Sequence, residues 1–101
     1  MTTNVLTAVI TAYCSCKLCC GPNAKGITAN GQKAKAEVTI AASRSIPFNS
    51  TVIVGNKSYI VQDRLARRYD SRFDIYMSSH QSALNFGIRT QQVTIITKAK
   101  Q

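Results

Sequence analysis

The chain has 101 residues, of which 45% are hydrophobic and 17% charged, a composition that excludes a disordered segment and fits one globular domain. Thirteen lysines and arginines against four aspartates and glutamates give a formal net charge of +9, which favours an anionic partner such as nucleic acid or a bacterial wall polymer. Residues 1–13 lack the features of a signal peptide, and no apolar run reaches the roughly 20 residues of a membrane-spanning helix, so we expect neither.

The first half of the chain predicts four strands. Val5–Tyr13 alternates apolar and Thr-rich positions, which is typical of a strand with one buried face. Val38–Ala41 is a short apolar strand. Two β-branched runs, 51–54 and 57–62, flank Gly55-Asn56, and this pair tolerates the positive φ of a tight hairpin turn.

The second half predicts a strand at Phe73–Met77, a helix at His80–Phe86, a last strand at Gln92–Thr97 and a frayed tail at 98–101. Ser78 or Ser79 caps the helix, Ser78 with Gln81 has capping-box spacing, and Gly87 suits the position after the helix. Five or six short strands and one helix predict a compact, mostly-β barrel.

The segments TAYCSCKLCCG (11–21), GITANG (26–31), TIAASRSIPFNSTVIV (39–54), YIVQDR (59–64) and RFDIYMSSHQSALNFG (72–87) cover nearly the whole chain. Together they resemble the three-aspartate (3D) domain family, which is similar to the catalytic core of membrane-bound lytic transglycosylase A. The resemblance implies a mostly-β fold, a small six-stranded double-psi β-barrel with one short helix, as a single domain over residues 1–101. It also implies a bacterial or phage protein that cleaves peptidoglycan glycan strands in the cell wall, the periplasm or outside the cell.

Two of the three family aspartates have counterparts here. Asp74 matches the acid/base of the transglycosylases and Asp63 matches a second aspartate, whereas Ala42 stands at the third position. Residues 64–68 replace a glycine-rich stretch that lines the cleft in relatives, and Asn49 replaces a usual glycine. We expect four further side chains to contact substrate: Tyr13, Arg64, Arg72 and Tyr76. The structural alternative is packing for the tyrosines and salt bridges from the aspartates to Arg64, Arg68 or Arg72.

Lytic transglycosylation needs one carboxyl group that protonates the glycosidic oxygen and then deprotonates the muramoyl 6-hydroxyl, which closes a 1,6-anhydro ring. Neither metal nor cofactor is required. The acid must stay protonated near neutral pH, so its pKa has to be raised by apolar surroundings or by a neighbouring anion. Asp74 lies between Phe73 and Ile75 on an apolar strand, and Asp63 is the natural second carboxylate.

The cysteines Cys14, Cys16, Cys19 and Cys20 fall within seven residues. Two local disulfides, a structural zinc site and free thiols all fit this spacing. A zinc site would need a further ligand, such as His80 or an acid, if the cysteine geometry fails. One thiol could also be a nucleophile with His80 as its base, in a peptidase acting on wall peptides. In the structural alternative, His80 has no catalytic role and is a partly exposed residue at the start of the helix.

These observations are compatible with three functions. A peptidoglycan lytic transglycosylase is favoured by the Asp63 and Asp74 contexts. A non-catalytic barrel that binds the wall or a polysaccharide is favoured by Ala42 and by the altered 64–68 segment. A nucleic-acid-binding barrel rests on charge alone, because the chain lacks the interleaved aromatic residues of single-strand-binding surfaces.

Overall fold

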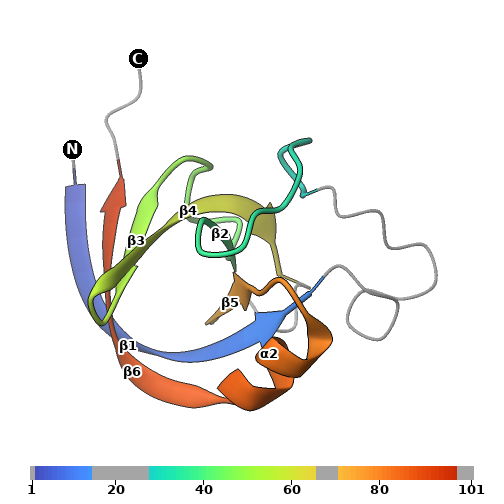
Figure 1. Ribbon diagram of the computed structural model, residues 1–101. Helices are drawn as coiled ribbons and strands as arrows, with labels where there is room; N and C mark the ends of the chain where they lie inside the picture. Colours follow the sequence, from blue (N-terminus) through green and yellow to red (C-terminus); the bar gives the residue numbers. More distant parts are fainter. Residues whose placement is uncertain (1, 15–27, 66–70, 98–101) are drawn as a thin grey trace.

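The computed structural model describes residues 2–14, 28–65 and 71–97. Within these ranges there are six strands and one helix (Figure 1): β1 (Thr2–Tyr13), β2 (Thr39–Ala42), β3 (Thr51–Val54), β4 (Lys57–Arg64), β5 (Arg72–Tyr76), α2 (His80–Phe86) and β6 (Arg89–Thr97). No helix in these ranges has the length and apolar character needed to cross a membrane. The predicted frayed tail and Cys16, Cys19 and Cys20 lie outside the described residues.

The strands close into a barrel in the order β1-β5-β2-β4-β3-β6. β1 pairs with β5 and β2 pairs with β4 in parallel, whereas the other four neighbouring pairs are antiparallel. The two halves of the chain have equivalent places in this order: β1 corresponds to β4, β2 to β5 and β3 to β6, and corresponding pairs of strands run in the same sense. The two halves are therefore related by pseudo-two-fold symmetry. The predicted mostly-β, six-stranded barrel with one short helix is confirmed.

The barrel core takes one β-branched residue from every strand. Each of these side chains is at most 1% exposed: Ile10, Ile40, Val52, Val61, Ile75 and Val93. Because successive side chains of a strand point to opposite faces, the immediate neighbours of these core residues face away from the barrel interior. This alternation decides which polar side chains can gather on the outer face.

The observed strands extend beyond the predicted ones mainly at the starts of β1 and β6. β1 begins at Thr2 and β6 at Arg89, and the residues added to each strand pair with the predicted part of the other strand along the antiparallel β1–β6 ladder. Residues 2–7 are exposed, so apolar alternation could not signal the start of β1. The predicted hairpin is confirmed, with Gly55 at φ 64° in the turn between β3 and β4.

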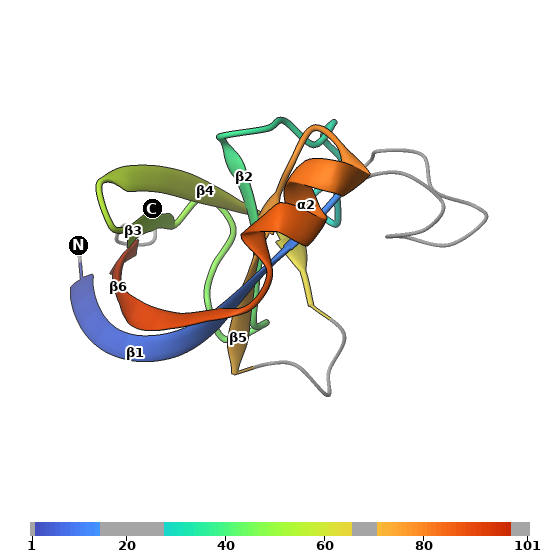
Figure 2. The ribbon, with the colours of Figure 1, turned by 60° about the horizontal axis from the view of Figure 1, so that its bottom comes forward.

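Helix α2 spans the predicted residues and lies beside the end of β1 (Figure 2). Its N-cap is Ser79, whose hydroxyl oxygen accepts a 3.1 Å hydrogen bond from the Ser82 N–H, so the Ser78–Gln81 capping box is not the one used. Gly87, at φ 69°, donates its N–H to the Ala83 carbonyl and ends the helix as predicted.

Candidate functional site

Asp74 and Asp63 lie on either side of Ala41 in the sheet. Asp74 on β5 is paired in register with Ala41 on β2, and Ala41 is paired in register with Asp63 on β4. On the other side of Asp74, β1 contributes Thr11 as its register partner. Four neighbouring strands therefore place one hydroxyl, two carboxyl groups and a small alanine in a single row across the sheet.

The two carboxyl groups reach the same face for different reasons. Asp74 faces outward because its neighbours Phe73 and Ile75 belong to the core. Asp63 lies two residues after the core residue Val61, so regular alternation would turn it inward. A register shift between Ile40 and Ala41 adds one residue to β4 and turns Asp63 outward, as β-bulges near functional sites commonly do.

The extra residue of the bulge is Gln62. Its side-chain carbonyl accepts a 2.6 Å hydrogen bond from the Thr39 hydroxyl, and its backbone carbonyl accepts a 3.1 Å hydrogen bond from the Asn30 N–H. The segment around Asn30 thus docks on the bulge. The backbone carbonyl of Gln62 is thereby satisfied, and the two contacts hold the bulge that precedes Asp63.

The half-buried Asp74 carboxyl group has a strongly perturbed acidity. Burial raises the pKa of Asp74 from 3.8 to about 6; a 3.0 Å hydrogen bond from the Thr11 hydroxyl lowers it in part, and the charge of Asp63 raises it. The structure therefore gives Asp74 an environment that favours the protonated acid, whereas a salt bridge would favour the anion.

The Asp63 carboxylate is held by three donors. Its oxygens accept hydrogen bonds from the Tyr13 hydroxyl (2.8 Å), the Ala29 N–H (2.9 Å) and the Arg64 N–H (2.9 Å). An ionised carboxylate is purely an acceptor, so this set of donors suits a negatively charged group in a fixed orientation. Asp63 and Asp74 therefore have different surroundings, and these suit an anion and an acid respectively.

The two predicted tyrosines lie beside this pair. Tyr13 on β1 and Tyr76 on β5 are register partners, and their rings meet edge to face with centroids 5.4 Å apart. Tyr13 also donates to Asp63, so the ring pair is connected to the carboxylates by a direct hydrogen bond. The structure thus brings together Asp74, Asp63, Tyr13 and Tyr76.

The two predicted arginines have different positions. The Arg64 guanidinium donates to the Ser43 and Ile46 carbonyls at 3.1 and 2.8 Å and stacks 3.9 Å above the centre of the Phe48 ring. These contacts bind it to the turn after β2. Arg72 is half-buried and lies two residues before Asp74, on the same face of β5.

The two departures from the family pattern have structural counterparts. Ala42 is fully buried and belongs to the hydrophobic core, so its side chain does not face the carboxyl pair. Asn49 adopts φ 71°, a left-handed conformation that glycine and asparagine tolerate better than other residues, which fits a position where glycine is usual.

Cys14 and His80 also meet in the structure. The Cys14 Sγ atom at the end of β1 lies 3.9 Å from Nδ1 of His80 at the start of α2. Cys14 is buried, 2% exposed, and His80 is half-buried. Within residues 2–14, 28–65 and 71–97, no group of three or more metal-ligating side chains comes together. The proposed zinc site and local disulfides would involve cysteines outside these ranges.

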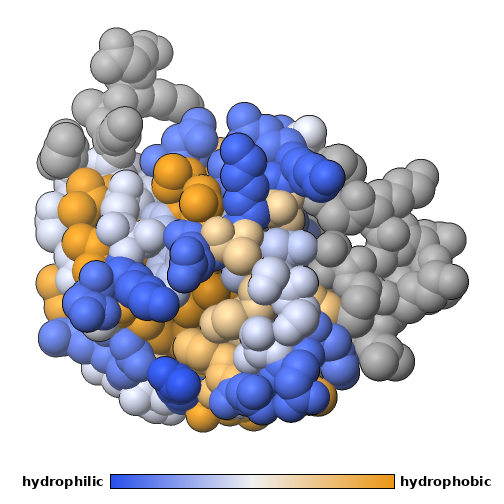
Figure 3. Space-filling view, in the orientation of Figure 1, coloured by the Kyte–Doolittle hydropathy of each residue, from blue (hydrophilic) through white to orange (hydrophobic). Residues whose placement is uncertain are grey.

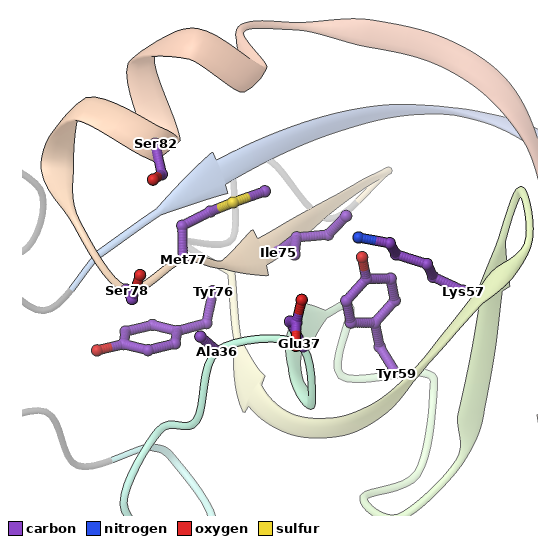
Figure 4. Close-up of a pocket in the computed structure, with 9 residues that line it drawn as sticks. All are labelled: Ala36, Glu37, Lys57, Tyr59, Ile75, Tyr76, Met77, Ser78 and Ser82. Carbon is purple, nitrogen blue, oxygen red and sulfur yellow. The ribbon is translucent and has the colours of Figure 1, made fainter.

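Sequence reasoning missed two parts of the site. Thr11 was not singled out. Its alternation with apolar residues showed that it lies on the polar face of its strand, but only the β1–β5 register shows that it lies beside Asp74. A pocket of about 350 Å³ at the mouth of the barrel, lined in part by Glu37, Lys57 and Tyr59, was also missed, because its residues come from separate segments (Figure 4).

Comparison with known proteins adds no assignment to this geometry. No family model matches the chain, and no curated protein matches it. The function must therefore be argued from the residues that the fold brings together.

Proposed function

We propose that the protein is a peptidoglycan-cleaving enzyme of the lytic transglycosylase type, with Asp74 as its single acid and base. The observation that carries this proposal is the half-buried Asp74 carboxyl group, whose pKa is raised to about 6 by burial and further by the charge of Asp63, two strands away. At pH 7 roughly one molecule in ten then carries the proton on Asp74, against about one in a thousand for an unperturbed aspartate. The resemblance to the three-aspartate family points to the same residue.

In the proposed reaction, protonated Asp74 donates its proton to the oxygen that joins a muramoyl residue to the next glucosamine. The bond from that oxygen to the anomeric carbon breaks, and positive charge develops on the sugar. The Asp74 carboxylate then takes the proton of the muramoyl 6-hydroxyl, whose oxygen bonds to the anomeric carbon and forms the 1,6-anhydro ring. The proton is back on Asp74 at the end, so the cycle consumes no water.

Asp63 and Thr11 position and tune this acid. The Thr11 hydroxyl hydrogen-bonds the Asp74 carboxyl group and fixes its orientation on the outer face of the barrel. Asp63, held by three donors, supplies a fixed negative charge that raises the pKa of Asp74 and stabilises the cationic sugar. Ala41, the register partner of both aspartates, lies between them and adds no charge or hydrogen-bonding side chain of its own.

The test is mass spectrometry of the soluble products released from purified peptidoglycan sacculi by the wild-type protein and by Asp74→Asn. We expect anhydromuramoyl fragments from the wild type and none from the variant. Reducing-end sugars instead would mean hydrolysis at the same site. If nothing is released while sacculi still sediment the protein, a non-catalytic wall-binding barrel replaces the enzyme.

The contact between Cys14 and His80 supports a second candidate, a thiol peptidase acting on the peptides of the wall. The Sγ–Nδ1 distance of 3.9 Å is close to that of a nucleophile and its base, but the thiol is only 2% exposed. Release of peptides that survives Asp74→Asn and disappears in Cys14→Ser would establish this candidate. Under either proposal the partner is peptidoglycan and the place of action is the wall, the periplasm or the exterior of the cell.

A further inference from the structure

A pocket at the mouth of the barrel carries two opposite charges. It has a volume of about 350 Å³, and it lies between the end of β5, the start of β4, helix α2 and the residues just before β2. Glu37 and Lys57 both line it, together with Tyr59 (Figure 4). The space-filling view of this side of the molecule shows hydrophilic side chains around a more apolar hollow (Figure 3).

Glu37 and Lys57 are not paired with each other in a salt bridge. Within the described part of the chain the structure records no salt bridge between the Glu37 carboxylate and the Lys57 ammonium, although both side chains line one pocket. The pKa of the Tyr59 hydroxyl is raised by burial first and by the charge of Glu37 second, so the carboxylate is close enough to act on the pocket wall. The pocket therefore offers an anion, a cation and a hydroxyl group to one ligand.

The backbone at Glu37 supports a ligand-binding role for this residue. Glu37 adopts φ 68°, in the left-handed region that side chains with a Cβ atom rarely occupy. Strained backbone of this kind is concentrated at binding and catalytic sites, because elsewhere a glycine or asparagine would remove the cost. The exposed position of Glu37 gives it no packing role in the core.

We propose that the pocket binds a zwitterionic amino-acid group, with its ammonium at Glu37 and its carboxylate at Lys57. Ile75 and Met77 form the apolar part of the wall, which suits the aliphatic carbons between two such charges. A second hollow of about 400 Å³ shares Lys57, Tyr59, Ile75 and Met77, and it gives room for a longer chain. Volumes of this order are typical of small-molecule sites.

The position of the pocket connects it to the carboxyl pair. Tyr76 lines the pocket, and its ring packs on Tyr13, which donates to Asp63. A polymer lying across Asp74 could therefore place a side branch in the pocket. If the proposed function holds, the natural occupant is the peptide branch of peptidoglycan, which carries amino and carboxyl groups; this identification rests on the proposed function, whereas binding of the zwitterion does not.

The test is a titration of the full chain, labelled with ¹³C at the methionine methyl groups, with alanine, N-acetylalanine and alaninamide. The chain has two methionines, and Met77 lines the pocket, so the Met77 methyl signal reports on binding. We expect alanine to shift the Met77 signal saturably. Each capped form, which lacks one charge, should bind roughly three- to fivefold more weakly, as expected for one exposed ion pair.

Two variants assign the charges. Glu37→Gln should weaken alanine binding three- to fivefold and leave N-acetylalanine, which has no ammonium, unaffected. Lys57→Met should weaken alanine and leave alaninamide, which has no carboxylate, unaffected. An unmoved Met77 signal, or equal weakening of all three ligands by both variants, would overturn the proposal.

A last measurement separates this inference from the proposed function. Asp74→Asn should bind alanine as the wild type does. In the wild type, kcat/KM for peptide-bearing glycan should exceed that for peptide-free glycan, and this ratio should fall in Glu37→Gln. Alanine binding without any glycan cleavage would remove the proposed function and keep the pocket, whereas cleavage without alanine binding would remove the pocket and keep the enzyme.

Discussion

The Tyr13 hydroxyl donates a 2.8 Å hydrogen bond to Asp63, 50 positions further along the chain, so the end of β1 is tied to β4 although these strands are not neighbours in the barrel. The bond crosses the row of strands that carries Asp74. It gives the second carboxylate a fixed place relative to the first. The same hydroxyl belongs to a ring that forms one side of the site.

Tyr13→Phe removes this bond and leaves the ring. We expect the free energy of unfolding to fall by about 0.5–1.5 kcal/mol, the usual net value of one hydrogen bond, and glycan cleavage to slow because Asp63 is less well held. Urea denaturation and the rate of anhydromuramoyl release measure the two effects. In an Asp63→Asn background the substitution should cost clearly less; an undiminished cost would show that the hydroxyl acts through another partner.

Asp74→Asn should change how stability depends on pH. The folded-state pKa of Asp74 is about 6 and lies above the unfolded value of about 4, so between these values the folded protein holds a proton that the unfolded chain has released. The wild type is therefore destabilised by this group as the pH rises from about 4 to about 6, by up to about 3 kcal/mol. Asparagine does not titrate and escapes this loss.

The measurement is chemical denaturation of both proteins at pH 4 and pH 7.5. Asp74→Asn should gain stability relative to the wild type at the higher pH, and the difference between the proteins should open across the window from pH 4 to pH 6. The same difference in free energy of unfolding between the two proteins at pH 4 and at pH 7.5 would contradict the raised pKa. The wild-type rate of cleavage should also decline as the pH rises above about 6, because a smaller fraction of the molecules then carries the proton on Asp74.

Thr11→Val should raise the pKa of Asp74 further. The Thr11 hydroxyl lowers this pKa by donating to the carboxyl group, and valine keeps the β-branched shape without the donor. The ¹³C shift of the Asp74 carboxyl group followed against pH gives the value directly. Thr7→Val, on an exposed part of the same strand, is the matched control and should leave the titration of Asp74 unchanged. A pKa that stays or falls in Thr11→Val rules out this role for the hydroxyl.

Arg64→Met should destabilise the turn after β2. The guanidinium donates to two backbone carbonyls, Ser43 and Ile46, and covers the Phe48 ring. Losing these contacts should cost about 1–3 kcal/mol in the free energy of unfolding. Arg89→Met is the control, because Arg89 also lies over a phenylalanine ring but is exposed; its cost should stay within about 0.5 kcal/mol. Equal costs would mean that Arg64 is no more than a surface residue.

The sequence predicted the parts of the fold that local pattern controls. Alternation around Ile10 and Ile75, the Gly55-Asn56 turn and the start and end of α2 all depend on residues close together in the chain. Asp74 was identifiable because a carboxylate between two core residues is unusual. Local pattern could not supply the register that places Asp74 beside Ala41, since pairing between distant strands is decided by tertiary packing.

The bulge at Gln62 shows the same limit. Alternation from Val61 assigns Asp63 to the inner face, and only the shifted pairing with β2 turns it outward. The pocket at the barrel mouth was also beyond local pattern, because Glu37 and Lys57 belong to segments that meet only when the barrel closes. Residues of the site were thus partly predictable, whereas their directions were not.

The long sequence separation within the site has a consequence for folding. The pKa of Asp74 is set by burial in the folded barrel, by the Thr11 hydroxyl 63 positions away, which lowers it, and by Asp63 on β4, which raises it, so no local segment of the chain can form this environment. Folding through such distant pairings is slow, on the order of milliseconds to seconds. Until the parallel strands have joined, Asp74 is an ordinary, ionised aspartate. The raised pKa of Asp74 is therefore a property of the assembled sheet, which appears only when β1, β5, β2 and β4 have come together.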